Sequence, residues 1–148
     1  AGLKRLGWEQ RTTQLFEPEE LVPAIGQGAL GIEVRADDAA IRSALAAVHD
    51  AETATATAAE RAFLERLGGG CQVPMGAHAR ITGSELRLVG LVADQESSAV
   101  VRGTLAGPTA EAEALGTRLA EQLLAQGAEE ILATIRAGSG NLQPPGAA

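Results

Sequence analysis

Three consecutive glycines, Gly68 to Gly70, mark the point where the hydrophobic pattern of the chain changes its period. Before them, Ala59, Phe63 and Leu67 recur at the spacing of one helix face. After them, residues 77–82 alternate between apolar and polar, as in a strand with one buried face. Because successive glycines lose much conformational entropy on ordering, they favour a loop between these two elements.

The rest of this region repeats the strand pattern and then returns to helix. The predicted strands cover residues 77–82, 86–92 and 99–105, with a turn at Gly83-Ser84. One predicted helix runs from a cap at Asp50 to Leu67, a second opens at Gly107-Pro108-Thr109 and ends at Gly127, and a short third reaches residue 137. Residues 48–137 are therefore predicted to form an α+β domain, a three-stranded antiparallel sheet packed against about three helices.

Residues 1–47 contain too few elements to build a core of their own. The pattern predicts a helix end over 1–7, a short strand over 10–16, a turn-rich link over 17–23, a strand over 30–35 and a helix over 39–47 capped by Asp37 or Asp38. We expect these segments to be partial pieces of two α/β domains. Because the chain opens on what looks like the end of a helix, we also expect it to be part of a longer protein.

Composition excludes several classes of function. The 148 residues have a formal net charge of −7 and three aromatic side chains, which argues against a nucleic-acid-binding surface. No apolar run approaches the roughly 18 residues of a membrane span. One cysteine cannot form an internal disulfide, which fits a reducing cytoplasm. The Gly- and Pro-rich tail over 138–148 is predicted to be disordered.

Cys71, the one thiol, follows the glycines directly. A lone cysteine is most often a small buried hydrophobic residue, but a glycine-rich loop gives a thiol the exposure that reactivity requires. A thiol enzyme using Cys71 with His78 remains an alternative. His49 and His78 are too far apart in sequence, without supporting ligands, to predict a metal site. Glu60-Arg61 and Glu65-Arg66 are interpreted as a solvated helix face.

Several motifs resemble one enzyme family in order along the chain. They are AGLKRLG at 1–7, PAIGQGALGIEVR at 23–35, AERAFLERLGGGCQVP at 59–74, GGCQVPMGAHA at 69–79 and LAEQLLAQGAEEIL at 119–132. Together they resemble the C-terminal half of porphobilinogen deaminases, also called hydroxymethylbilane synthases, and the likeness spans nearly all of residues 1–136. Met75 departs from the family pattern, because a branched aliphatic residue is usual there.

The resemblance implies a three-domain fold and a reaction. Residues 1–22 would end the second domain, residues 23–47 would return to the first, and residues 48–137 would form the C-terminal domain that carries the cofactor. The family's enzyme is a cytoplasmic monomeric transferase that condenses four porphobilinogens into linear hydroxymethylbilane and releases ammonia. It builds the growing polypyrrole chain on a covalently attached dipyrromethane cofactor. The rival interpretation is a small α+β binding or regulatory module without cysteine chemistry.

The resemblance also assigns residues. Cys71 would hold the dipyrromethane through a thioether, and Arg5 would bind carboxylates of the cofactor or substrate, as arginine does well. Gln27 and Gly28 would line the pyrrole site. The G-x-G-x-x-G pattern at 26–31 follows no predicted strand, so we reject a dinucleotide site. The family's catalytic aspartate lies in the N-terminal half, so no catalytic residue is predicted in this chain, and Arg35 stays open between a strand-end charge and a cleft residue.

Overall fold

The computed structural model describes residues 2–68, 74–94 and 97–139. Its first elements are the helix α1 (Gly2–Arg5), a 3-10 turn (Glu9–Arg11), the helix α2 (Ala39–Leu45) with a 3-10 turn (Ala46–Val48), and the long helix α3 (Ala51–Leu67). The strands β1 (Met75–Thr82), β2 (Glu85–Ala93) and β3 (Val100–Pro108) come next. A 3-10 turn (Thr109–Glu111) leads into α4 (Ala112–Leu123), which joins α5 (Glu129–Ser139) through Leu124–Ala128.

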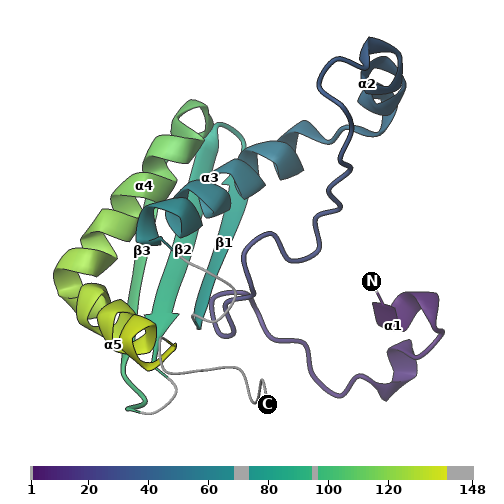
Figure 1. Ribbon diagram of the computed structural model, residues 1–148. Helices are drawn as coiled ribbons and strands as arrows, with labels where there is room; N and C mark the ends of the chain where they lie inside the picture. The colour runs from purple at the N-terminus through teal and green to yellow at the C-terminus, as the bar shows by residue number, and fades with distance from the viewer. Residues whose placement is uncertain (1, 69–73, 95–96, 140–148) are drawn as a thin grey trace, which may run out of the picture.

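The three strands form an antiparallel meander in the order β1-β2-β3. Helices α3 and α4 lie side by side across one face of this sheet, and α5 continues from α4 at the lower end in Figure 1. The buried core lies between these layers, with Phe63, Leu88 and Leu119 fully buried in it. The predicted α+β class, the antiparallel sheet and its helical layer are therefore confirmed.

Local sequence explains where most elements begin and end. Asp38 and Asp50 cap α2 and α3 by accepting from the N–H groups of Ile41 and Thr53. Gly68 ends α3 in the left-handed conformation, with φ of 64°, and Gly127 interrupts the last helices with φ of 109°. The Gly83-Ser84 turn joins β1 to β2 as predicted, since Thr82 pairs with Glu85.

Three element predictions are wrong. Residues 10–16 contain a 3-10 turn and then irregular chain, and residues 30–35 are not a strand either. A strand needs a neighbour for its N–H and C=O groups, and the described part of the chain offers none at these places. The helix predicted to open at Gly107 begins later, because β3 continues to Pro108 in pairing with Glu85.

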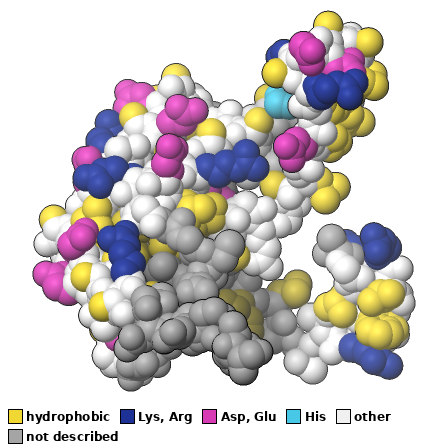
Figure 2. Space-filling view, viewed as in Figure 1, with side chains coloured by type: hydrophobic (Ala, Val, Ile, Leu, Met, Phe, Trp, Pro, Cys, Tyr) yellow, Lys and Arg dark blue, Asp and Glu magenta, His cyan; other side chains and the backbone are white. Residues whose placement is uncertain are grey.

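The surface of the N-terminal segment is unusually apolar. Large hydrophobic side chains that stay exposed gather before residue 49, and Figure 2 shows such side chains around α1 and along the arm that carries α2. They include Leu3, Leu6, Leu15, Phe16, Leu21, Leu30, Ile32, Ile41 and Val48. Exposed apolar surface of this kind marks places where another protein surface packs.

The Cys71 loop lies outside the described residues. The prediction of a disordered tail over 138–148 is wrong at its first two residues, because α5 continues to Ser139, and residues 140–148 lie outside the described residues. No helix of the described chain combines the length and the apolar character needed to cross a membrane.

The Asp50 cap predicts a pH-dependent stability. The Thr53 backbone N–H and the Thr53 side chain hold the pKa of Asp50 below its usual value. Because the folded-state pKa is depressed, the stabilisation is present above the unfolded pKa and is lost as pH falls through the folded pKa. Asp50→Ala should lower the melting temperature by a few degrees at neutral pH and much less in acid.

Thermal melts from pH 7 to pH 2 of the wild-type, Asp50→Ala and Asp50→Asn chains measure this effect. Asparagine also caps helices but does not titrate, so Asp50→Asn should keep the stability near neutrality and lack this part of the pH dependence. If Asp50→Ala lowered the melting temperature by the same amount at pH 7 and at pH 2, ionisation of Asp50 would contribute nothing to the stability of the cap.

Candidate functional site

Gln27 and Gly28 lie in a tight double turn at the side of the sheet. The Gln27 N–H donates to the Ala24 carbonyl at 3.0 Å, and the Ala29 N–H donates to the Gly26 carbonyl at 3.1 Å. Gly26 and Gly28 have φ of 70° and 91°, a conformation that L side chains rarely adopt. A side chain at Gly28 would meet no atom within 4 Å, so its backbone is open to an approaching ligand.

The Gln27 side chain has a partner inside the same turn. It is exposed, and its Oε1 accepts from the Ala24 N–H at 3.1 Å. The amide nitrogen of this side chain therefore stays available as a donor, the group that a ligand carboxylate would use.

Glu60 fixes this turn to the sheet. Its side chain extends from α3, is 5% exposed, and accepts from the Gly26 N–H at 2.7 Å and from the Ala79 N–H at 2.8 Å. The Nδ1 atom of His78 lies 3.9 Å from the same oxygen that Ala79 contacts. The prediction that Glu60 belongs to a solvated face is wrong, whereas Arg61, Glu65 and Arg66 are exposed as expected.

The segment before the turn lies across the face of the sheet that the helices leave open. The Ala77 N–H on the outer edge of β1 donates to the Pro23 carbonyl at 3.2 Å, and a side chain at Gly76 would lie 3.1 Å from the Val22 carbonyl oxygen. Arg102 of β3 donates to the Glu19 carbonyl. Gly76, Leu91 and Arg102 are register neighbours, so residues 19–23 meet this row at β1 through Val22 and Pro23 and at β3 through the Arg102 side chain.

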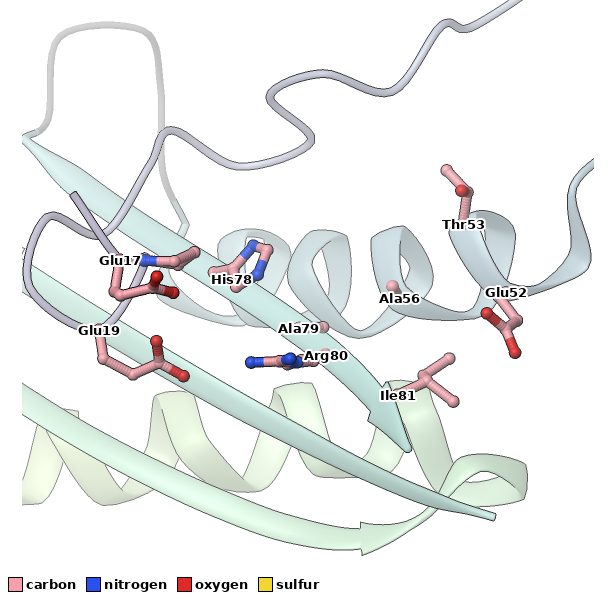
Figure 3. A pocket seen from close by; sticks show the side chains of 10 residues that line it. Glu17, Glu19, Glu52, Thr53, Ala56, His78, Ala79, Arg80 and Ile81 are labelled. Carbon is pink, nitrogen blue, oxygen red and sulfur yellow. The ribbon is translucent and has the colours of Figure 1, made fainter. Parts of the chain in front are cut away.

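A shallow hollow lies beside this crossing. It measures about 380 Å³, and its lining mixes the carboxylates of Glu17, Glu19 and Glu52 with His78 and Arg80, as Figure 3 shows. A second hollow of about 580 Å³ runs between residues 28–32 and the outer side of α3, where Gly28 and Arg61 are among the lining residues. Of the predicted site residues that the structure describes, Gly28 lines the second hollow, and Arg5 and Gln27 line neither.

Arg5 and Cys71 are not brought to the turn. Arg5 ends α1, which stands apart from the sheet in Figure 1, and its side chain is exposed. The neighbouring Lys4 forms a long ion pair with Glu9 at 4.0 Å. Cys71 lies outside the described residues, between the end of α3 at Leu67 and the start of β1 at Met75. Gln27 and Gly28 therefore share one turn, while Arg5 faces solvent.

Two models of known protein families match this chain, one in its N-terminal part and one in its C-terminal part. The model of the porphobilinogen deaminase C-terminal domain matches residues 54–125. The model of the porphobilinogen deaminase dipyromethane cofactor binding domain matches residues 1–43. The chain belongs to the porphobilinogen deaminase family.

Curated relatives agree with this assignment. The porphobilinogen deaminases of Syntrophotalea carbinolica and Trichlorobacter lovleyi are each 51% identical, over 91% and 89% of this chain, and that of Geotalea daltonii is 48% identical over 91%. The chain spans 43%, 42% and 42% of these relatives, less than half of their length. The predicted family is confirmed, and the predicted dipyrromethane cofactor is confirmed at the level of the family by the description of its matching model.

Proposed function

We propose that this chain is the C-terminal half of a hydroxymethylbilane synthase, the transferase of tetrapyrrole biosynthesis that condenses four porphobilinogens and releases ammonia. The observation that carries the proposal is the pair of family matches, over residues 1–43 and 54–125, in one chain whose second match contains the GGCQVP loop. The apolar surface before residue 49 is what an N-terminal half of the same protein would cover.

The proposed site residues offer hydrogen-bond donors and open backbone, which are the groups that a pyrrole ligand with carboxylate side chains would need. Arg5 presents an exposed guanidinium, Gln27 has a free amide donor, and Gly28 leaves its backbone open. Carboxylates are bound best by such donors, arginine above all. We propose that Arg5 binds a cofactor or substrate carboxylate and that Gln27 and Gly28 contact the pyrrole rings, once the rest of the protein closes the cleft around them.

Cys71 is the proposed point of attachment of the dipyrromethane. When bound, this group supplies the pyrrole carbon to which the first substrate is joined and so primes the polymer. The contribution of Cys71 is a thioether that keeps the growing chain at high local concentration beside the reacting centre. Cys71 is therefore a tether in this proposal, and the proton and ammonia chemistry belongs to an aspartate outside this chain.

The remaining parts of the proposal concern the whole protein. Its domains would divide at residues 22–23 and 47–48, with residues 48–137 as the domain that carries the cofactor. We propose a cytoplasmic monomer whose partners are porphobilinogen, the growing polypyrrole and its own N-terminal half. This chain alone would be inactive.

Ammonia release from porphobilinogen by the complete protein, followed together with formation of the linear tetrapyrrole, tests the proposed reaction. A complete protein that releases no ammonia and forms no tetrapyrrole contradicts the proposal.

Arg5 offers a matched test of the proposed carboxylate contact. Arg5→Ala in the complete protein should raise KM for porphobilinogen, or reduce cofactor loading, by about tenfold or more, since hydrogen bonds to charged groups have this magnitude. Lys4→Ala is the control, because Lys4 is another exposed cation one residue away whose 4.0 Å ion pair stabilises little. Equal behaviour of the two variants would remove Arg5 from the site.

A further inference from the structure

The Glu60 side chain is 5% exposed, and both of its carboxyl oxygens accept a hydrogen bond from a backbone N–H group. An isolated buried carboxylate is costly, and such groups survive where backbone N–H groups satisfy them. Each Glu60 oxygen receives one N–H: Oε2 that of Gly26, and Oε1 that of Ala79. Among the described residues no buried side-chain nitrogen or oxygen lacks a hydrogen-bond partner, and the two oxygens of Glu60 are satisfied by these two N–H groups.

The two donors come from different parts of the molecule. Ala79 belongs to β1, whose other edge pairs with β2, so its N–H points outward from the free edge of the sheet. Gly26 lies 34 residues before Glu60, in the turn that contains Gln27. Glu60 thus joins α3, β1 and the turn at one point, and together with Pro23 it supplies acceptors to the edge strand.

Only a glutamate fits this arrangement. Glutamine has one oxygen and one NH₂ group, so one of the two backbone N–H groups would face a donor instead of an acceptor. Aspartate is one methylene shorter than the reach that α3 requires. His78 adds little, because its Nδ1 lies 3.9 Å from the carboxylate, beyond hydrogen-bond distance.

The turn is held on the sheet through Pro23, Ile25 and Gly26. The Pro23 carbonyl accepts from Ala77, the half-buried Ile25 side chain packs against the core, and the Gly26 N–H donates to Glu60. Gln27 and Gly28 themselves are exposed, and the hydrogen bonds within residues 24–29 fix the shape of the turn but not its place. The Gly26 contact with Glu60 is the one nearest to Gln27.

We propose that Glu60 is a positioning residue for substrate binding, which holds the 24–28 turn against β1 so that Gln27 and Gly28 meet the pyrrole ligand in the right place. The inference rests on the proposed function for the ligand, and on the hydrogen bonds of Glu60 for the positioning. Its role differs from that of a core residue, because its loss should displace a ligand-binding turn and leave the sheet in place.

Amide hydrogen exchange in this chain tests the positioning independently of any activity. Glu60→Ala should speed exchange at Gly26 and Ala79 about tenfold or more relative to Leu88 in the centre of the sheet. Phe63→Leu, one turn further along α3, is the control, since Phe63 is a core residue that packs on Gly90 and has no side-chain acceptor for the N–H groups of Gly26 and Ala79. Unchanged exchange at Gly26 in Glu60→Ala would overturn the proposed anchoring.

Kinetics of the complete protein test the consequence for binding. Glu60→Gln should raise KM for porphobilinogen about tenfold with a smaller change in kcat, whereas Phe63→Leu, with a comparable loss of melting temperature, should leave KM unchanged. An unchanged KM in both variants would reduce Glu60 to a structural residue and overturn the inference. A wild-type protein that does not consume porphobilinogen would instead contradict the proposed function, and the exchange experiment would still decide whether Glu60 anchors the turn.

Discussion

Replacing Cys71 by serine should lower ammonia release by the complete protein at least about a hundredfold, the lower end of what tethering contributes to effective concentration. A serine hydroxyl is a far weaker nucleophile than a thiolate near neutral pH, so it should not capture the first pyrrole unit. The protein should still fold, because the change removes no described core contact. Its intact mass should lack the dipyrromethane.

Met75→Leu is a suitable control for this variant. Met75 lies four residues later at the start of β1, is half-buried, and packs against the core, where leucine is close to it in volume. That variant should keep both the adduct and the activity. Full activity of Cys71→Ser would exclude the tether and equally the alternative of a Cys71–His78 thiol enzyme.

Replacing Gly116 by alanine should destabilise the chain by about 2 kcal/mol or more, in the range of overpacked cores. In an exposed helix the same change stabilises by about 1 kcal/mol, because alanine is the better helix former. At Gly116, however, an added Cβ would lie 2.1 Å from the Ala59 carbonyl oxygen and 2.9 Å from the Phe63 nitrogen. Both are backbone atoms of α3, so α3 and α4 would have to separate.

Urea unfolding of the Gly116→Ala chain measures this loss, with Thr117→Ala as the control. Thr117 is the next residue of α4 and is half-buried, and its hydroxyl bonds back to the Glu113 carbonyl of the same helix, so its replacement should change stability by less than about 0.5 kcal/mol. A Gly116→Ala chain as stable as the wild type would show that the two helices do not meet as closely as described.

The architecture of residues 48–137 could be predicted because each element there carries its own signal. Asp50 and Gly68 bound α3, and Gly83-Ser84 sets the first strand turn. The alternation of apolar residues over 30–35 gave a wrong prediction of a strand. Such alternation is typical of a strand with one buried face, but the described residues neither cover this segment nor offer it a strand to pair with. Leu30 is 96% exposed for this reason.

The site was predictable only in part. Gln27 and Gly28 were predicted from the family resemblance and stay predictions as ligand contacts, and their place on the sheet depends in part on Glu60. In sequence Glu60 stands beside Arg61 in a charged stretch, and burial by a turn 34 residues away has no local signature. Its position directly after the core residue Ala59, on the stripe that leads to Phe63, is the one signal that could have suggested it.

Intact-mass measurement of this chain tests the central claim most directly, namely that Cys71 carries a dipyrromethane whose assembly needs the other half of the protein. The chain would be measured after expression alone, and again after mixing with the N-terminal half and porphobilinogen. We predict an unmodified mass for the chain alone, since capture of a pyrrole by a thiol needs the second reactant bound and oriented beside it, and the groups proposed to do so belong to the other half of the protein. We predict a dipyrromethane adduct on Cys71 in the mixture. An adduct on the chain expressed alone, or none in a mixture that forms tetrapyrrole, would contradict the account.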